Sequence, residues 1–224
     1  MRVGIYHVGN NVNYLRLGAV ACAVAKTHGY EVSHLTDMDT PAIDGAKVVR
    51  RKMTAPMAVF RMQHHQVDGE WLFIDSDVLI HKPVDRVFEH EFSIALAQRK
   101  PSDGTNTEGA LPLYKEMPYN MGVVFSRSPQ FWAEVEKELL TYDANLQHWM
   151  GDQLAWCKLI AAKPRLVKLL DCRFNFPPGK NGKLYGAPIV HYKGNRKPMM
   201  MDHAYGILSG ADVSSTEPAA TLPA

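Results

Sequence analysis

Four consecutive apolar residues, Trp71-Leu72-Phe73-Ile74, run directly into Asp75-Ser76-Asp77, and this junction limits the fold more than any other feature of the sequence. An unbroken apolar run is typical of a strand that is covered on both faces, as in a parallel sheet. In open α/β sheets, ligands bind beyond the carboxyl ends of such strands. The junction therefore predicts a central, buried strand with a polar site at its carboxyl end.

The residues before this strand predict further elements of an α/β sheet. Short apolar runs predict strands, and apolar side chains that recur every three or four residues predict helices. On these patterns we expect strands at residues 2–8, 30–35 and 47–50, and helices at residues 14–27 and 55–66. The order strand, helix, strand, strand, helix, strand is typical of nucleotide-binding α/β domains.

The second half of the chain is less regular. We expect strands at 92–96, 120–126 and 189–191, a helix from Ser128-Pro129 through Leu140, another helix from about Asp152, and a loop over 101–117. A serine followed by proline supplies a helix N-cap and a first-turn proline. The sequence has no internal repeat and no linker-like segment, which indicates a single domain over residues 1–210 with a loose tail over 211–224.

Composition and charge narrow the classes of protein that fit this sequence. The 224 residues carry a formal net charge of +2, which is too small to require a nucleic acid or an anionic membrane as partner. The longest apolar run, residues 17–25, is far shorter than the roughly 20 residues that span a bilayer, and the amino-terminal residues lack secretory features. Scattered cysteines argue against a disulfide framework or a zinc site. We therefore expect a cytoplasmic protein without a transmembrane segment.

Asp75 and Asp77 place two carboxylates two residues apart. Mg²⁺ and Mn²⁺ prefer oxygen ligands and commonly bind through one or two carboxylates together with a substrate phosphate. Two buried carboxylates repel each other unless a cation compensates them. The same residues are also common in solvated turns at the end of a strand. The acidic pair by itself leaves both interpretations open.

Five segments form an ordered set along the chain. They are Val59-Phe60-Arg61-Met62, Phe73 to Asp77 followed by Val78-Leu79-Ile80, Tyr119-Asn120-Met121-Gly122-Val123, Gly151-Asp152-Gln153, and His191-Tyr192-Lys193-Gly194-Asn195-Arg196-Lys197-Pro198. In this order they resemble the arginine helix, the DxD motif, the N-x-G-V strand, the Asp-Gln pair and the H-x-x-G-x-x-K-P element of glycosyltransferase family 8.

This resemblance implies a GT-A fold, which is an α/β fold with a Rossmann-like mixed sheet flanked by helices. It also implies an enzyme that moves a hexose from a nucleotide-sugar, of the UDP-glucose or UDP-galactose type, to a hydroxyl acceptor with retention of configuration. The metal implied is Mn²⁺ or Mg²⁺, held by Asp75, Asp77 and His191. His191 taken alone would also fit a structural histidine.

The resemblance also implies which residues contact the donor. They are His7, Val8, Asn10, Arg61, Asp75, Ser76, Asp77, Asn120, Gly122, His191, Gly194 and Lys197. The two residues implied in catalysis are Asp152, which would bind sugar hydroxyls, and Gln153, which would lie beneath the anomeric carbon. Simpler interpretations stay open: Asp152 can cap a helix, and Arg61 and Lys197 can lie at the surface. Asn120 can occupy a turn before a strand.

The first loop departs from the family pattern. The family usually carries acidic residues where the base and ribose are read, whereas this chain has His7-Val8-Gly9-Asn10-Asn11. The base is therefore open, although asparagine side chains can read uracil. The acceptor is open as well, and can be a saccharide, a protein, a small molecule or a modified DNA base. So is the oligomeric state.

Other classes of protein fit parts of the pattern. A phosphatase of the haloacid dehalogenase class would use Asp75 as nucleophile, but its motif normally opens the domain, and it leaves the segment from His191 to Pro198 unexplained. A nucleotidyltransferase can share the fold and the metal, and would release pyrophosphate from a nucleoside triphosphate. A non-catalytic module would bind the donor without transferring or hydrolysing it.

Overall fold

The computed structural model describes residues 1–99, 117–148, 150–179 and 182–210. Within these residues, seven strands form a sheet in the order β3-β2-β1-β4-β7-β6-β8, and β5 pairs with β9 in a separate two-stranded sheet. The strands are β1 (Arg2–Tyr6), β2 (Glu31–Thr36), β3 (Lys47–Arg50), β4 (Trp71–Asp75), β5 (Val78–Ile80), β6 (Ile94–Gln98), β7 (Tyr119–Ser126), β8 (Val167–Leu170) and β9 (Ile189–His191).

Parallel pairing brings several strand ends to one edge of the sheet. β1 pairs in parallel with β2 on one side and with β4 on the other, and β3 is parallel to β2. Tyr6 at the end of β1 is therefore in register with Asp75 at the end of β4. β7 runs antiparallel to β4, so that its first residues, around Tyr119, reach the same edge. This edge is where an α/β sheet places its ligand site.

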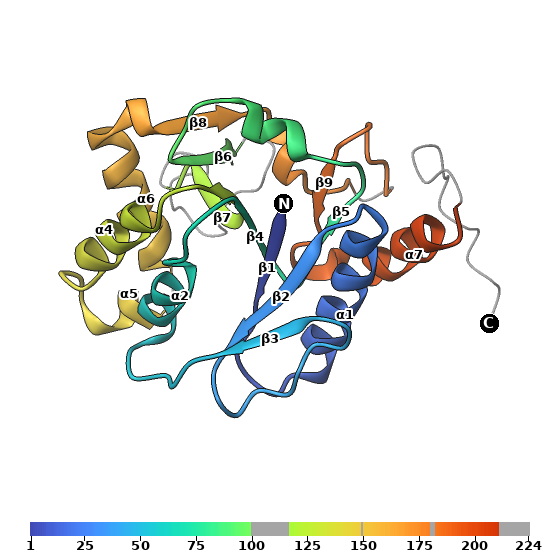
Figure 1. Cartoon of the computed structure of the whole chain (residues 1–224), viewed down its shortest axis with the longest axis horizontal. Helices are drawn as coiled ribbons and strands as arrows, with labels where there is room; N and C mark the ends of the chain where they lie inside the picture. Colours follow the sequence, from blue (N-terminus) through green and yellow to red (C-terminus); the bar gives the residue numbers. More distant parts are fainter. Residues whose placement is uncertain (100–116, 149, 180–181, 211–224) are drawn as a thin grey trace.

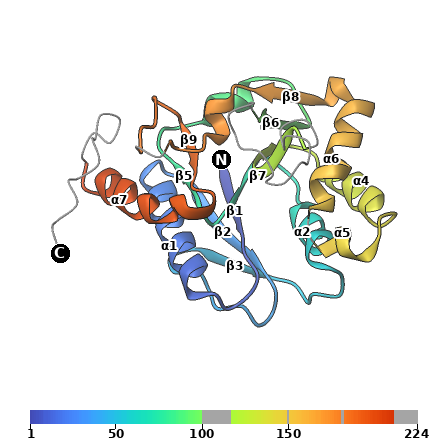
Figure 2. The same cartoon turned by 180° about the vertical axis from the view of Figure 1, so that it is seen from behind.

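Helices cover both faces of the sheet (Figures 1 and 2). On one face, α1 (Val12–Thr27) packs against α7 (Lys197–Leu208) and β5. On the other face, α4 (Pro129–Leu139) packs against both α2 (Met57–His65) and α6 (Gly151–Ala162), and α5 (Ala144–His148) packs against α2 and α6. Single turns of 3₁₀ helix are η1 (Asp85–Glu89), η3 (Pro164–Leu166), η4 (Cys172–Asn175) and η5 (Gly194–Arg196). The result is a mixed α/β sheet flanked by helices, as expected.

β4 separates two hydrophobic cores. Leu72 and Ile74 belong to the core beneath α1 and α7, whereas Trp71 and Phe73 belong to the core beneath α2, α4 and α6. Each of these four side chains is at most 6% exposed. A strand with apolar side chains on both faces must lie inside a sheet that is covered on both sides. The predicted central strand is therefore confirmed.

Every predicted strand and helix within the described residues is present, with bounds that differ by two residues or fewer. The predicted N-cap at Ser128 is confirmed, because its Oγ accepts a hydrogen bond from the backbone N–H of Phe131 at 3.2 Å. The expected loop over 101–117 lies outside the described residues except for Met117, and so does the expected tail over 211–224. No helix in the described part of the chain is both long and apolar enough to cross a bilayer.

Some elements are absent from the sequence prediction. β5 has only three residues, too few for a periodic pattern. β8 lies at the edge of the sheet and is only partly buried, so its residues do not alternate clearly between apolar and polar. The hydrophobic periodicity of the sequence also did not predict α7, although a proline in the first turn, here Pro198, is common at helix starts.

Three buried histidines lie in the core, His34 on β2 and His64 and His65 on α2. His34 Nδ1 accepts a hydrogen bond from the backbone N–H of Ile43 at 3.1 Å. His65 stacks on Phe73 with ring centroids 4.1 Å apart, and neither of its ring nitrogens has a hydrogen-bond partner among the described residues. Burial lowers the pKa of His34 and of His64 to about 4, and lowers the pKa of His65 well below its ordinary value.

We expect these histidines to make folding sensitive to acid. They stay neutral in the folded chain, whereas in the unfolded chain they bind protons below a pKa of about 6.5. Stability is therefore fully present above that pH, and each histidine removes up to about 1.4 kcal/mol of unfolding free energy per pH unit between roughly 6.5 and 4. Urea unfolding across this window measures the slope. His65→Phe should reduce the slope, whereas a change at the exposed His90, to Gln, should not. Equal slopes for His65→Phe and the parent would contradict this prediction.

Candidate functional site

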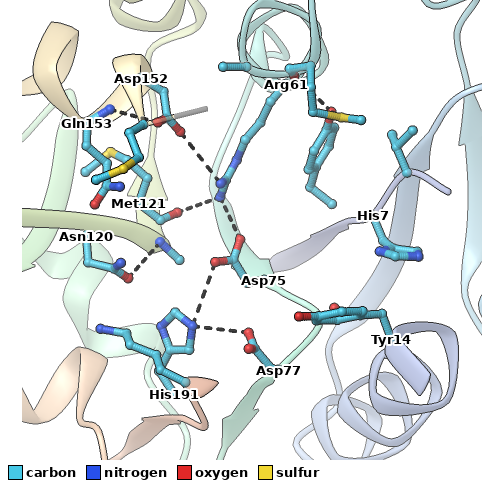
Figure 3. Close-up of a pocket in the computed structure, with 18 of the residues that line it drawn as sticks. His7, Tyr14, Arg61, Asp75, Asp77, Asn120, Met121, Asp152, Gln153 and His191 are labelled. Atoms are coloured by element: carbon cyan, nitrogen blue, oxygen red, sulfur yellow. Dashed lines mark hydrogen bonds and ion pairs between the residues drawn. The ribbon is translucent and has the colours of Figure 1, made fainter. Parts of the chain in front are cut away.

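A cavity of about 670 Å³ opens at the carboxyl edge of the parallel strands. Its wall is built by the end of β1, the starts of α1 and β7, the turn after β4, helices α2 and α6, and the segment from β9 to α7. All of the site residues expected from the sequence line this cavity except Asn10, which is exposed. Residues more than a hundred positions apart in the sequence therefore share one site (Figure 3).

Asp75, Asp77 and His191 converge on one point of the wall. His191 Nε2 lies 3.1 Å from Asp77 Oδ1 and 3.8 Å from Asp75 Oδ2. One ligand atom from each residue lies within 4.8 Å of the other two. β4 carries Asp75, the turn into β5 carries Asp77, and β9 carries His191, which is in register with Val78 in the β5–β9 pair. The pairing of two very short strands thus brings the distant histidine to the acidic pair.

The outer oxygens of the two carboxylates are held by cationic side chains. Arg61 donates to Asp75 Oδ1 at 2.9 Å, and Lys197 Nζ lies 2.9 Å from Asp77 Oδ2. Burial would raise the pKa of Asp77, but hydrogen bonds and charge interactions with His191 and Lys197 outweigh burial and lower that pKa. Burial, with the charge of Lys193, lowers the pKa of His191, so that the imidazole is neutral. With its proton on Nδ1, this imidazole would present an electron pair beside the inner oxygens of the two carboxylates.

Arg61 points inward. Its guanidinium donates to Asp75 and to the backbone carbonyl of Met121, at 2.6 Å, and lies 3.9 Å from Asp152 Oδ2 (Figure 3). Its side chain is 14% exposed, which excludes the alternative of a surface arginine. Arg61 is thus placed between the two aspartates that the sequence assigns to metal and to sugar.

Gly122 leaves the space that the cluster of Asp75, Asp77 and His191 occupies. A Cβ atom at this position would overlap His191 Cε1 and would lie 2.7 Å from Asp75 Oδ2. Such contacts are far shorter than ordinary van der Waals separations, so that any side chain here would displace the cluster. Asn120, two residues earlier, accepts a hydrogen bond from the Gly122 N–H through Oδ1 at 3.1 Å. Asn120 lies within β7 rather than in a turn before it.

Asp152 lies inside the first turn of α6 and is not its N-cap. The helix starts at Gly151, and the residue that caps it is Met150, with φ of 67° in the left-handed region. The N-cap alternative for Asp152 is therefore wrong, because Asp152 lies two positions after the N-cap. Burial raises the pKa of Asp152, against the opposing charge of Arg61. Gln153 follows on the cavity wall, where its Oε1 accepts a hydrogen bond from Arg99.

The first loop wraps the end of β1 next to α1. His7 stacks on Tyr14 with ring centroids 5.9 Å apart, and Val8 lines the cavity. Asn11, rather than Asn10, faces the cavity, and its Oδ1 caps α1 by accepting from the N–H of Asn13 at 3.0 Å. The sequence offers no signal that separates adjacent asparagines, because the start of α1 decides which one turns inward.

Lys197 is the first residue of α7, and its amino group reaches the acidic cluster. Besides Asp77, Nζ lies 5.2 Å from the centre of the Tyr14 ring. Burial would lower the pKa of Lys197, but Asp77 outweighs burial and raises it, so the amine stays charged. The Lys197 side chain is 23% exposed and paired with Asp77, so it is partly buried at the cavity wall rather than freely solvated. Gly194, on the same wall, has φ of 62°, a conformation that favours glycine.

Several residues of the site were not found from the sequence. Tyr14, Met57, Met150 and Lys193 line the cavity. Asn175 contacts His191 from η4, with Oδ1 3.0 Å from Nδ1 of the imidazole. Lys193 occupies a variable position of the segment from His191 to Pro198, and the others lie outside the five segments, so only their position in the fold identifies them.

Comparisons with known proteins add information on the fold. No protein-family model and no curated protein matches this sequence. Solved structures of glycosyltransferases do match it. GlyE of Streptococcus pneumoniae TIGR4 is 15% identical with a TM-score of 0.59 over 94% of this chain, and its apo form is 17% identical with a TM-score of 0.62 over 93%. This chain has a glycosyltransferase fold.

Two further glycosyltransferase structures have the same fold. One is involved in glycosylation of the major capsid of PBCV-1; it is 13% identical, with a TM-score of 0.55 over 90% of this chain and 100% of its own. The other is the bifunctional WbbM, 12% identical, with a TM-score of 0.57 over 96% of this chain and 50% of its own. The present chain spans 63% and 62% of the two GlyE structures, so that it corresponds to a part of that protein.

Proposed function

We propose that this protein is a metal-dependent glycosyltransferase that moves a hexose from a UDP-linked sugar to a hydroxyl acceptor with retention of configuration. One observation carries the proposal. Two carboxylates and a neutral imidazole converge on the wall of a large cavity, in a chain with a glycosyltransferase fold. Resemblance of the surrounding motifs to glycosyltransferase family 8 supports the choice of donor and the retention.

Mn²⁺ or Mg²⁺ fits the residues that surround this point. Asp75 Oδ2, Asp77 Oδ1 and His191 Nε2 face one another, and each can supply an electron pair to a cation that replaces the contact between Nε2 and Asp77. A mixed carboxylate and imidazole set suits Mn²⁺ better than Ca²⁺. The missing side chain at Gly122 keeps the space open. A metal bound here would act as a Lewis acid towards the diphosphate of the donor.

The leaving group of the proposed reaction is a nucleoside diphosphate. Breaking the bond between sugar and phosphate leaves negative charge on its oxygens, and charged donors placed in advance stabilise such charge. Lys197 presents a charged amine next to the acidic cluster, where it would pair with the departing phosphate. Gly194 has no Cβ that would keep a phosphate away from the backbone.

The part of the cavity wall formed by Asn120, Asp152 and Gln153 would hold the sugar of the donor. Asp152 would offer a carboxylate oxygen to sugar hydroxyls, and Arg61 lies 3.9 Å from that carboxylate. Asn120 would offer its amide NH₂, because its Oδ1 already accepts from Gly122 and Asn175. Gln153 is an amide and therefore a poor nucleophile, so that a covalent glycosyl-enzyme is disfavoured. We propose instead that the acceptor hydroxyl attacks from the face that the diphosphate leaves, and that this attack retains the anomeric configuration.

A panel of nucleotide-sugars tests the proposal. We expect purified protein to release UDP from UDP-glucose or UDP-galactose when Mn²⁺ or Mg²⁺ is present, and to stop when EDTA removes the metal. NMR of a transferred product should show the same anomeric configuration as the donor. No metal-dependent release from any donor in the panel would overturn the proposal, and an inverted linkage would overturn the retention.

A nucleotidyltransferase is the second candidate, because it can share the fold and the metal. The same panel therefore includes nucleoside triphosphates with sugar phosphates, from which release of pyrophosphate would support that candidate. The phosphatase alternative has less support, because three strands and two helices precede Asp75, and because Asp75 is paired with Arg61. The ordered set of motifs favours sugar transfer over both.

A further inference from the structure

Asn175 is a buried polar residue beside the proposed metal cluster. It ends η4, is 7% exposed, and lies outside every motif that the sequence analysis identified. The next residue, Phe176, is fixed to β9 by two backbone hydrogen bonds: its N–H donates to Ile189 at 3.1 Å, and its carbonyl accepts from His191 at 2.9 Å. The backbone thus places the Asn175 amide at a defined position next to the His191 ring.

The hydrogen bonds of this amide determine its orientation. Nδ2 donates to two oxygens of Asn120, the backbone carbonyl and Oδ1, each at 3.1 Å. An amide NH₂ group only donates and an amide oxygen only accepts. Since the NH₂ end is turned to Asn120, the oxygen end faces His191, and Oδ1 lies 3.0 Å from Nδ1.

This orientation favours one tautomer of His191. Asn175 Oδ1 accepts a hydrogen bond when Nδ1 carries the ring proton, whereas Asp77 Oδ1, 3.1 Å from Nε2, favours a proton on Nε2. In the neutral Nδ1–H form the other nitrogen, Nε2, has a free electron pair. Nε2 is the atom that faces Asp75 and Asp77. The opposite tautomer would point an N–H group at the place where the metal is proposed to bind.

We propose that Asn175 is a positioning residue that holds His191 in its metal-binding tautomer and ties it to Asn120. The second part of this inference follows from the shared hydrogen bonds: Asn120 Oδ1 also accepts from the Gly122 N–H at 3.1 Å. One buried amide thus connects the histidine of the metal cluster with the strand that lines the sugar side of the cavity. The inference about metal binding rests on the proposed function, whereas the inference about the tautomer does not.

The tautomer is tested without metal or substrate. In ¹⁵N–¹H NMR spectra of the metal-free protein, the neutral His191 ring should populate the Nδ1–H form, in competition with the Nε2–H form that donates to Asp77. Asn175→Leu removes the acceptor, and the ring should then populate the Nε2–H form. His191→Gln assigns the signals. A His191 ring that keeps the Nδ1–H form in Asn175→Leu would overturn the inference.

Metal affinity tests the consequence. Loss of a residue that orients a metal-binding histidine typically weakens binding by about 10- to 100-fold, and we expect a loss of this size for Mn²⁺ in Asn175→Leu and Asn175→Ala. Asn175→Asp keeps an acceptor for Nδ1–H but cannot donate to Asn120. It should therefore keep Mn²⁺ affinity within about threefold. The donor KM should rise in the same variant, because Asn120 is released.

Isothermal titration with Mn²⁺ and the histidine nitrogen coupling in EPR spectra provide these readouts. The matched control is Asn145→Leu, on the exposed surface of α5 and away from the cavity wall, which should change neither. Thermal unfolding shows which variants fold. Equal loss of Mn²⁺ affinity in Asn175→Asp and Asn175→Leu would reduce Asn175 to a packing residue and overturn the inference. No Mn²⁺ binding by the parent protein would instead overturn the proposed function, while the NMR result would still decide the tautomer.

Discussion

Asp77→Asn should lower metal-dependent turnover of the donor by about a thousandfold or more. The substitution keeps the shape of the side chain but removes the negative charge that faces both His191 Nε2 and Lys197. A bound cation contributes several kcal/mol to stabilising charge in a transition state, and each 1.4 kcal/mol or so is a factor of ten in rate. The measurement is kcat for UDP release at saturating Mn²⁺, with a Mn²⁺ titration beside it.

Asp171→Asn is the matched control for this experiment. Asp171 is an exposed carboxylate that pairs with Arg173 at 2.9 Å and does not line the cavity. Its loss should leave kcat unchanged, since exposed ion pairs contribute little. An Asp77→Asn protein that folds normally and turns over within tenfold of the parent would show that Asp77 does not hold a catalytic metal.

Gly122→Ala should weaken Mn²⁺ binding by about a hundredfold or more, although it removes no functional group. The added methyl would overlap the His191 ring and approach Asp75 Oδ2 to 2.7 Å. Both ligands would have to move, and displaced ligands cost one to two powers of ten each in affinity, on the scale seen for residues that orient metal ligands. Isothermal titration with Mn²⁺ measures the loss directly, and donor turnover should fall with it.

Gly29→Ala is the control for the general cost of replacing a glycine. Gly29 has φ of 78°, and nothing lies within 4 Å of an added Cβ. This variant should lose some stability from backbone strain and keep its Mn²⁺ affinity. Gly122→Ala with parental Mn²⁺ affinity would mean that the three ligand atoms do not act together.

The local pattern of apolar and polar residues was sufficient to predict most of the strands and helices of the fold. The unbroken apolar run before Asp75 requires a strand covered on both faces, and β4 separates two cores as predicted. Helix periodicity and the Ser128-Pro129 cap located α4 to within a residue or so. These features depend on neighbours in the chain, which is why they can be read without coordinates.

The pairing of short elements was not predictable in the same way. β9 was predicted at residues 189–191, but β5, its three-residue partner, was not, and neither was their pairing. That pairing matters for the site, because it sets His191 in register with Val78, next to Asp77. Spacing along the chain gives no information about such a contact between distant residues.

The sequence by itself determined which residue types gather at the end of β4: an acidic pair, an arginine helix and a late His–Lys element. Only the tertiary structure decided how they meet. It turned Arg61 inward between Asp75 and Asp152, chose Asn11 over Asn10 for the cavity wall, and moved Asp152 from the cap into the first turn. It also added Asn175, which no motif contains. The physical reason is that helix and strand periodicity follow from local backbone geometry, whereas hydrogen-bond partners and excluded volume depend on elements brought together by packing.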